Sequence, residues 1–358
     1  MHVVSNTIWL WFLCSWLLAC AVTWLSLHYA RHAKLLDMPG QRRSHDVPTP
    51  RGGGIGIVVA VLAGLCAAGI LFPGGHLPLL LVIAIAMVAL TGWIDDHEPL
   101  PVWARLLVHF LASVIWLAPL IGAAFFSGLD LGINPAQAML LSGGLVFACM
   151  WSINLHNFMD GIDGLLTVQA IFVLSALAVL CLRGPNPVHA LQIGLWIAAL
   201  VGFLPFNFPR PRLFMGDVGS GAIGMLIAVA AIWQFSTRDT AAASGLVAAS
   251  AFVVDSGCTL VSRMLRGRRW YRAHREHLYQ WMVRTGMSHA RVVAYYTVWN
   301  IVVVIPALYW MNRHVATHTQ VRGWIIAGIV YAFALIVWIF GKYRCLRKIE
   351  SETSHAFA

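Results

Sequence analysis

The segment NLHNFMDGIDGL, residues 154–165, directly follows an apolar run at 137–153 and places two aspartates, two asparagines and a histidine where a membrane helix is expected to end. Asp and Gly are common turn residues, so one interpretation of this segment is an ordinary loop. The alternative is an active site at the surface of a membrane. The rest of the sequence helps to distinguish between these two interpretations.

The whole chain is far more apolar than a soluble domain. Of its 358 residues, 59% are hydrophobic and only 11% are charged. A membrane span needs about 20 mostly apolar residues. Such runs lie at 7–28, 54–72, 77–94, 102–121, 137–153, 165–182, 189–204, 219–234, 243–262, 291–310 and 323–341. The sequence therefore predicts an all-α integral membrane protein with about eleven transmembrane helices, forming one polytopic domain over residues 1–358.

Basic residues in the connections predict the orientation, because positively charged connections stay in the cytoplasm. One set of connections carries Arg31, Arg51 and the basic stretch 263–291, and the C-terminal tail lies on that side. The other set holds only Arg183, Arg238, Arg313 and Arg322. We therefore expect a periplasmic N-terminus and a cytoplasmic C-terminus, in the cytoplasmic membrane of a bacterium. No Lys or Arg precedes the first run, which argues against a cleaved signal peptide.

The formal net charge of +10 is concentrated on the predicted cytoplasmic face. This distribution favours membrane lipid headgroups and phosphorylated substrates as partners, rather than nucleic acid. The seven cysteines are scattered and form no C-x-x-C pair, so the sequence indicates neither a disulfide framework nor a zinc site.

The acidic residues are few, only 14, and five of them lie at the ends of predicted spans on one face. They are Asp95 and Asp96 in TGWIDDHEPLP (91–101), Asp160 and Asp163 in NLHNFMDGIDGL, and Asp217 in RLFMGDVGSG (212–221). An aspartate pair at a span end is commonly a solvated helix terminus. Three such segments on one face of an acid-poor protein instead favour a shared site.

Carboxylates that are crowded near a membrane repel one another, so a positive charge must compensate them. Mg²⁺ prefers oxygen ligands and shares its coordination sphere with phosphates, so it would suit both these aspartates and a diphosphate substrate. Asp255 lies inside a predicted span, where an ionisable side chain marks a functional site or pairs with an arginine of the bundle.

Three other patterns carry less weight. GSGAIG (219–224) and RGGGIG (51–56) lack the strand or lysine context of nucleotide-binding loops, so close helix packing is their better interpretation. His274 and His277 could share a helix face, but the sequence offers them no further soft metal ligand.

Taken together and in order, the motifs resemble the polyprenyl-phosphate N-acetylhexosamine-1-phosphate transferases, the family of the MraY and WecA types. The resemblance covers the chain from about Asp37 to Gly286. It rests on SHDVPTPRGGGIGI (44–57), the pair Asp95 and Asp96, NLHNFMDGIDGL, NFPRPRLFMGDVGSG (207–221), Asp255 and a basic, histidine-containing loop after it.

The resemblance implies an active site on the cytoplasmic face that uses Mg²⁺ or Mn²⁺, a UDP-N-acetylhexosamine donor and undecaprenyl phosphate as acceptor, with UMP released; a homodimer is also compatible with it. It assigns catalysis to Asp95, Asp96, Asp160 and Asp163, with Asp95 expected to align the lipid phosphate. Asp217 would bind the metal together with Asp96. Substrate-binding residues would be His45, Arg51, Asn157, Asn207 and His277.

The chain departs from the family pattern in HLYQ (277–280), where only His277 matches and Tyr279 and Gln280 replace two histidines. This change makes the chain more similar to the WbpL-like branch, which initiates O-antigen synthesis in lipopolysaccharide. The sugar stays open among N-acetylfucosamine, N-acetylquinovosamine and N-acetylglucosamine. A polytopic transporter or flippase for a lipid-linked or anionic substrate is the alternative function.

Overall fold

The structure is a computed structural model that describes residues 2–38, 47–71, 78–126, 134–182, 188–235, 241–269, 274–313 and 319–356. Its helices are α1 (His2–His32), α2 (Ile55–Leu71), α3 (Leu79–His97), α4 (Val102–Phe126), α5 (Pro135–Phe158), α6 (Leu165–Leu182), α7 (Val188–Asn207), α8 (Asp217–Phe235), α9 (Ala241–Ala248), α10 (Ser250–Leu265), α11 (Leu278–Arg284), α12 (His289–Trp299), α13 (Ile305–Asn312) and α14 (Thr319–Ala356). Two short strands, β1 (Leu36–Asp37) and β2 (Thr49–Pro50), pair antiparallel with Leu36 opposite Pro50.

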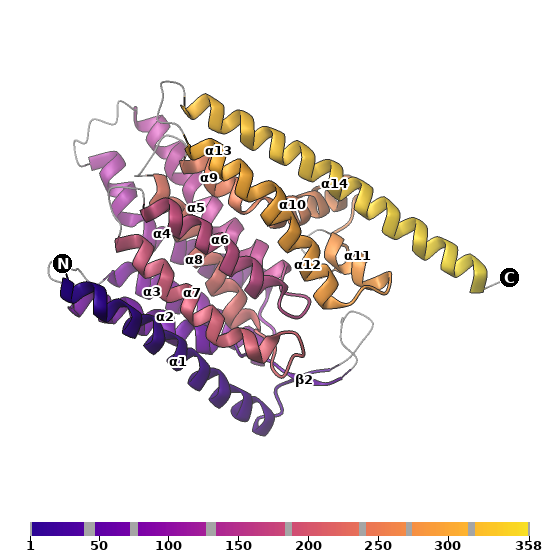
Figure 1. Cartoon of the computed structure of the whole chain (residues 1–358), viewed down its shortest axis with the longest axis horizontal. Coiled ribbons are helices and arrows are strands. Elements are labelled where there is room, and N and C mark those ends of the chain that lie inside the picture. The colour runs from indigo at the N-terminus through magenta and orange to yellow at the C-terminus, as the bar shows by residue number, and fades with distance from the viewer. Residues whose placement is uncertain are drawn as a thin grey trace.

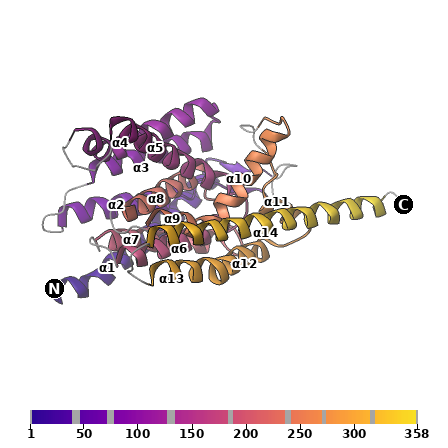
Figure 2. The same cartoon turned by 90° about the horizontal axis from the view of Figure 1, so that it is seen from above.

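The helices form one bundle in which α8 is central. It contacts α2, α3, α5, α6 and α9. In its most hydrophobic stretch of 18 residues, 78% of the residues are buried, compared with 17% in the corresponding stretch of the peripheral α1. Viewed from above, α3, α4 and α5 lie on one side of the bundle and α12, α13 and α14 on the other (Figure 2). The N- and C-termini lie at opposite ends of the molecule (Figure 1).

The all-α membrane fold is confirmed, although the number of clear spans is lower than expected. Within the described residues, nine helices are long and apolar enough to cross a membrane, and α12 and α13 form one of them through the π-helical turn Asn300–Val304. The expected span at 243–262 is bent by 77° between α9 and α10 and would be the tenth. The remaining expected run, α2, is a 17-residue helix of about 26 Å, shorter than the bilayer core of about 30 Å.

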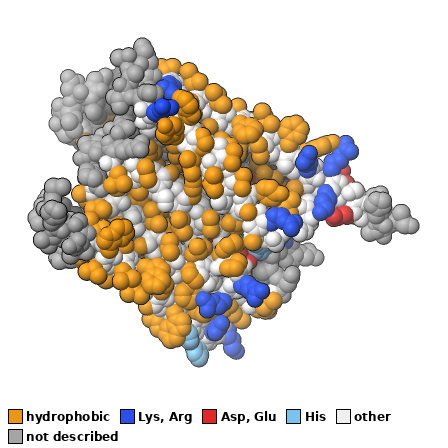
Figure 3. All heavy atoms as spheres, viewed as in Figure 1, with side chains coloured by type: hydrophobic (Ala, Val, Ile, Leu, Met, Phe, Trp, Pro, Cys, Tyr) orange, Lys and Arg blue, Asp and Glu red, His pale blue; other side chains and the backbone are white. Residues whose placement is uncertain are grey.

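The outer surface of the bundle is apolar, as a membrane protein requires. Large hydrophobic side chains such as Trp9, Leu140 and Leu265 are 74%, 78% and 84% exposed. Figure 3 shows hydrophobic side chains covering the middle of this face, whereas most Lys and Arg side chains lie toward the end where the C-terminus is. Lipid tails would cover the apolar belt and the headgroups would meet the basic end.

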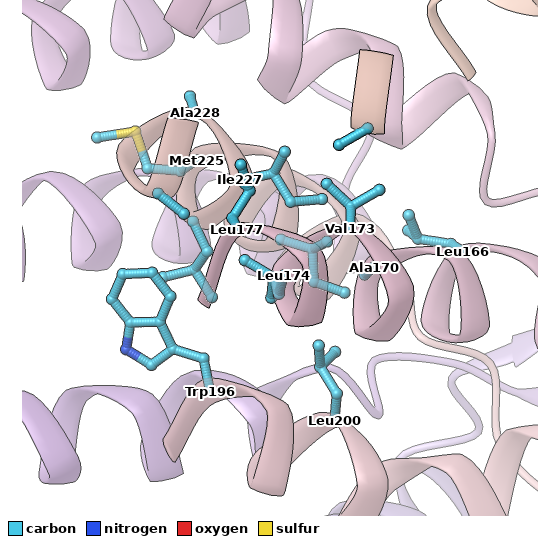
Figure 4. Close-up of a cluster of buried hydrophobic side chains, with 14 of the residues drawn as sticks. Leu166, Ala170, Val173, Leu174, Leu177, Trp196, Leu200, Met225, Ile227 and Ala228 are labelled. Atoms are coloured by element: carbon cyan, nitrogen blue, oxygen red, sulfur yellow. The ribbon is translucent and has the colours of Figure 1, made fainter. Parts of the chain in front are cut away.

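Buried side chains of α6, α7 and α8 form part of the main hydrophobic core. Leu166, Val173 and Leu177 of α6 and Trp196 and Leu200 of α7 belong to one buried cluster, and all five are at most 1% exposed (Figure 4). Since lipid is as apolar as these side chains, close packing rather than escape from water holds the helices together.

Both glycine segments that lack a nucleotide-binding context serve this packing. The Cα atom of Gly219 at the start of α8 lies directly against Gly54, so a side chain on either residue would clash. Further along α8, a Cβ atom at Gly224 would lie 2.6 Å from the Cα atom of Ile153 in α5. The interpretation of GSGAIG and RGGGIG as packing motifs is therefore confirmed.

Candidate active site

A cavity of about 180 Å³ opens at the end of the bundle where α3, α5 and α7 finish and α8 and α12 begin. This is the side of the molecule on which α11 and β2 lie (Figure 1). The cavity is lined by Asp37, Arg51, Asp96, Asp160, Gly161, Ile162, Asp163, Asn207, Phe214, Met215, Gly216, Asp217, Gln280 and His289. Five carboxylates thus face one arginine and one histidine, so the cavity is suited to a cation.

Asp96 holds the beginning of α8 in place. Its Oδ1 and Oδ2 atoms accept hydrogen bonds from the main-chain N–H groups of Asp217 and Val218, at 3.1 and 3.3 Å. These amides carry the positive end of the helix dipole, so the contact stabilises the carboxylate charge. Gly216 has φ +76°, and a side chain there would collide with the Asp96 carboxylate, so this junction requires glycine.

Asp95 is adjacent to Asp96 in sequence but lies outside the cavity lining. Its Oδ1 accepts a hydrogen bond from the N–H of Leu100 at 2.6 Å, and its Oδ2 is 2.6 Å from an Arg105 guanidinium nitrogen. The same guanidinium lies 3.1 Å from Oδ2 of Asp217. Arg105 therefore joins two carboxylates and holds the Asp217 side chain at the wall of the cavity.

The α5–α6 connection, residues 159–164, brings two more carboxylates to the cavity. Burial and the negative charges of Asp217, Asp96 and Asp163 raise the pKa of the Asp160 carboxyl well above its ordinary value. Asp163 lies 2.6 Å from Nδ1 of His289, at the start of α12, so this carboxylate already has a partner. Asp217 has only the guanidinium that it shares with Asp95, so Asp160 and Asp217 are the carboxylates on which a cation in the cavity would act most directly.

Two asparagines fix the loops around these aspartates. Oδ1 of Asn207 accepts a hydrogen bond from the N–H of Gly164 at 2.9 Å, and its Nδ2 donates to the carbonyl of Leu213 at 3.3 Å. Asn207 therefore joins the loops that carry Asp163 and Asp217. Asn157 donates to the hydroxyl of Ser220 in α8 at 3.1 Å, and it does not line the cavity.

Asp255 of α10, which lies inside a span expected from the sequence, contacts the beginning of α11. It is 2% exposed, and its carboxylate accepts hydrogen bonds from the N–H of Leu278 at 2.7 Å and from the hydroxyl of Tyr296 at 2.7 Å. Asp255 thereby anchors the beginning of α11, whose Gln280 lines the cavity. Its function in the described structure is to position α11, since it contacts neither Arg263 nor the cavity.

His277 is buried beneath α11 instead of facing the cavity. It is 2% exposed, its Nδ1 lies 4.0 Å from Asp255, and burial lowers its pKa. Tyr279, also fully buried, donates its hydroxyl proton to the carbonyl of Phe158 at 3.0 Å and leaves no room for a side chain at Gly161. Of the changed HLYQ segment, Gln280 is the residue that faces the cavity.

The structure brings together six of the residues expected from the sequence: Arg51, Asp96, Asp160, Asp163, Asn207 and Asp217. Three others, Asp95, Asn157 and His277, lie behind the lining and act on neighbouring residues. Arg51 donates a hydrogen bond to the main-chain oxygen of Asp96. His45 lies outside the described residues.

Sequence reasoning did not assign site functions to Asp37, Arg105, Gln280 or His289. Arg105 carried a usable signal, because it is an arginine inside the predicted span 102–121 and such a residue needs a buried partner. Gln280 also carried a signal, because it stands in HLYQ at the place of a family histidine. Asp37 and His289 carried none, since they come from separate elements that only the folded chain brings together.

The donor atoms around the cavity fit Mg²⁺ or Mn²⁺, which prefer oxygen ligands. Among the described residues, no three His, Cys, Asp or Glu side chains are arranged closely enough to form a complete metal site. This agrees with the usual behaviour of Mg²⁺, which one or two carboxylates hold while waters and substrate phosphates supply the remaining ligands. Asp217 would be one protein ligand and Asp160 or Asp96 the second, since a carboxylate oxygen that accepts a main-chain hydrogen bond keeps a lone pair for a metal.

Comparison with known proteins adds an independent observation. Residues 78–234, which include all five span-end aspartates, match glycosyl transferase family 4. The decaprenyl-phosphate N-acetylglucosaminephosphotransferase of Mycobacterium leprae is 29% identical over 318 residues, which cover 78% of this chain and 77% of the relative. The probable undecaprenyl-phosphate N-acetylglucosaminyl 1-phosphate transferase of Bacillus subtilis and the undecaprenyl-phosphate alpha-N-acetylglucosaminyl 1-phosphate transferase of Yersinia pestis are each 26% identical, over 71% of both chains.

Proposed function

We propose that the chain, whose residues 78–234 match glycosyl transferase family 4, transfers an N-acetylhexosamine 1-phosphate from a UDP-sugar to undecaprenyl phosphate and releases UMP. The observation that carries the proposal is the cavity in which Asp96, Asp160 and Asp217 converge from separate segments. Such an acidic cavity at the end of a membrane bundle suits a cation and the phosphates that share it. The proposed product is the first lipid-linked intermediate of a surface polysaccharide.

The reaction is a phosphoryl transfer. An oxygen of the lipid phosphate attacks the β-phosphorus of the UDP-sugar, the bond from this phosphorus to the bridging oxygen breaks, and UMP leaves with that oxygen. Positioning and charge neutralisation dominate such reactions. A bound Mg²⁺ would neutralise the diphosphate. Asp217, with Asp160 or Asp96, would hold this ion.

The other charged residues have positioning roles in this proposal. Arg105 lies between Asp95 and Asp217 and keeps the Asp217 carboxylate in place. Asp95 is directed toward Arg105 and Leu100, so it supports the site rather than touching the substrate. We therefore propose that Asp95 acts through Arg105 and Asp217 rather than by aligning the lipid phosphate itself.

The membrane location follows from the proposed acceptor. A polyprenyl chain does not leave the bilayer, because each buried methylene contributes about 0.8 kcal/mol. The catalytic cavity must therefore open where the lipid phosphate meets water, as it does at the end of the helices. We propose that this end faces the cytoplasm of a bacterium, where the basic connections are expected to lie.

The donor sugar depends on the residues that replace the family histidines. Gln280 lines the cavity, and its amide is held in place because Nε2 donates to the Tyr279 hydroxyl at 3.1 Å and Oε1 accepts from the N–H of His277 at 3.3 Å. An amide can donate to and accept from a sugar hydroxyl or acetamido group. We propose a UDP-N-acetylhexosamine such as N-acetylfucosamine, N-acetylquinovosamine or N-acetylglucosamine, and a place in O-antigen synthesis.

The proposal is tested by incubating the purified full-length chain with undecaprenyl phosphate, Mg²⁺ and a panel of UDP-N-acetylhexosamines, and measuring UMP and lipid product. Asp217→Asn is expected to abolish both. Glu98→Gln provides a matched control, because Glu98 is an exposed acid two residues after Asp96 and does not line the cavity.

Metal-dependent UMP release that survives in Glu98→Gln and disappears in Asp217→Asn would support the transferase and identify its sugar. Folded protein that releases no UMP with any donor would contradict the proposal for these sugars. Exchange of labelled UMP into the UDP-sugar without lipid acceptor would indicate a covalent intermediate, whereas its absence would favour direct attack.

A further inference from the structure

A second cavity, of about 420 Å³, shares the helix α11 with the acidic cavity. Gln280 of α11 lines the acidic cavity, whereas Trp281 and Arg284 of the same helix line this second one. Its lining residues are Arg263, Arg266, Arg268, His274, Arg275, Glu276, Trp281, Arg284, Lys342 and Leu346. We refer to it as the basic pocket.

The basic pocket has a large excess of positive charge. Five arginines and Lys342 share it with a single acid, Glu276. That acid is already engaged, since it accepts hydrogen bonds from Arg263 and, at 2.9 Å, from Arg268. Among the described lining residues Glu276 is the single carboxylate, so positive charge exceeds negative charge in the pocket.

Lys342 is the clearest sign that an anion belongs in this pocket. It is only 6% exposed, and its ammonium group has no hydrogen-bond partner among the residues that the structure describes. Its Nζ atom lies 4.4 Å from the centre of the Trp338 ring, a cation–π contact that satisfies none of its three donors. A buried ammonium without an acceptor is costly, so an anion that accepts its hydrogen bonds would stabilise the protein.

The surroundings of His274 give independent support. Burial and the positive charges of His277 and Arg263 lower the pKa of His274 to about 4, so the pocket resists a further positive charge. Its Nδ1 atom is buried and has no hydrogen-bond partner. Phosphate oxygens are good acceptors for arginine and lysine, and they carry the required charge.

The helices that form the walls of the pocket show where the phosphate would come from. Val261 and Leu265 on α10 are 54% and 84% exposed, and Phe340 and Tyr343 on α14 are 63% and 52% exposed. These exposed apolar side chains belong to the two helices that supply Arg263 and Lys342 to the pocket. A ligand with a phosphate in the pocket can therefore lay hydrocarbon chains along both helices.

We propose that the basic pocket binds the phosphate headgroup of an anionic membrane phospholipid, at a site separate from the acidic cavity. The lipid would stabilise α11, because Trp281 also donates a hydrogen bond to the carbonyl of Glu276 at 3.1 Å and the two residues share the pocket. Gln280 directly precedes Trp281 on this helix and lines the acidic cavity, so occupation of the basic pocket would steady one wall of that cavity.

The test measures lipid binding to the full-length chain purified in an uncharged detergent, by native mass spectrometry with added phosphatidylglycerol. The variant combines Arg266→Gln with Lys342→Gln. The matched control combines Arg344→Gln with Arg347→Gln, which removes the same charge from exposed positions of α14 outside the pocket. Phosphatidylcholine serves as the zwitterionic lipid, and UMP and inorganic diphosphate serve as soluble phosphates.

We expect one tightly held phosphatidylglycerol per chain, bound at least tenfold more weakly by the pocket variant and within twofold by the control. Equal weakening in both variants would overturn the proposal, because it would show general charge attraction only. Displacement of the lipid by UMP or diphosphate would also overturn it and assign the pocket to a soluble phosphate. Because Lys342 is buried, the single exposed change Arg266→Gln is tested in parallel; it should still weaken binding severalfold, and unchanged binding in a folded protein would contradict the proposal.

Discussion

The acidic cavity and the basic pocket are both lined by one seven-residue helix, α11, yet they are assembled in different ways. The carboxylates of the acidic cavity come from β1, α3, α8 and the α5–α6 connection. The cations of the basic pocket come almost entirely from residues 263–284, with Lys342 added by α14. The acidic cavity has more carboxylates than cations in its lining, and the basic pocket has more cations than carboxylates, so each is suited to a ligand of the opposite charge.

The largest expected effect is a loss of transferase activity on substitution in the acidic cavity. We expect Asp217→Asn to lower kcat by about a thousandfold, because a carboxylate that holds a cation at the diphosphate acts on the charge that develops in the transition state. UMP release under saturating substrates measures it. A variant that keeps more than a tenth of the wild-type rate would show that Asp217 is not part of the catalytic centre.

Arg105 tests whether the acidic cavity depends on a cation outside its lining. Arg105→Gln is expected to lower kcat about a hundredfold, because Asp217 loses the partner that positions it. When Asp95→Asn is added to Arg105→Gln in a double-mutant cycle, we expect little further loss of kcat. This corresponds to a coupling of about 1–2 kcal/mol in activation free energy between the two residues. Fully additive losses would mean that Asp95 acts separately from Arg105.

Substitution of Gly216, beside the acidic cavity, and of Gly267, beside the basic pocket, compares how strictly the backbone of each site requires glycine. Gly216 has φ +76° and no room for a side chain beside Asp96, whereas Gly267 has φ +64° and nothing within 4 Å of the position a Cβ atom would take. We expect Gly216→Ala to lower the free energy of unfolding by about 2–3 kcal/mol and Gly267→Ala by about 1 kcal/mol. Melting temperatures in detergent measure both, and equal losses would contradict the contact with Asp96.

The dependence of stability on pH provides a test of the cation in the acidic cavity. Because the folded-state pKa of Asp160 is raised, the folded chain binds more protons than the unfolded chain between the ordinary and the raised pKa, so stability falls as pH rises through this window. Mg²⁺ should offset the loss by pairing with the ionised carboxylates. At pH 8 we expect millimolar Mg²⁺ to raise the melting temperature by about 2–4 °C, and less at pH 5.5.

Asp160→Asn is the control for this dependence. Without Mg²⁺ it should flatten the decline of melting temperature with pH, since the group with the raised pKa is gone. A decline that is as steep in Asp160→Asn as in the wild type would place the titrating group elsewhere.

The smallest expected effect comes from the basic pocket. In uncharged detergent without added phospholipid, Lys342→Met should change the free energy of unfolding by less than about 1 kcal/mol, because it removes a buried ammonium that has no hydrogen-bond partner in the described part of the chain. Transferase activity should remain within about twofold, since Lys342 lies outside the acidic cavity. A large loss of stability or activity would mean that the Lys342–Trp338 contact holds α14 in place.

Much of the fold could be predicted from the sequence because the bilayer imposes a length and an apolar composition on every span. Each of the eleven expected runs is helical, and the run at 165–182 has the observed bounds of α6. The bend between α9 and α10 and the short α2 could not be predicted, since their residues are as apolar as those of the straight spans.

The candidate site was only partly predictable, for a reason that Asp95 and Asp96 illustrate. The sequence identifies both as acids at a span end and assigns them similar roles. Successive residues of an α-helix point about 100° apart, so the two carboxylates must face different neighbours. Asp95 meets Arg105, and Asp96 meets the amides at the start of α8.

By itself, the sequence determined the membrane class, the order of the apolar runs and the small set of aspartates at their ends, because hydropathy and residue type are local properties. Only the tertiary structure decided which of these side chains share a cavity, that Gln280 and His289 join them, and that the basic residues beyond α10 surround a pocket of their own. The physical reason is that charges act over a few ångströms in space, and helix packing, which close contacts such as Gly54 with Gly219 determine, sets those distances.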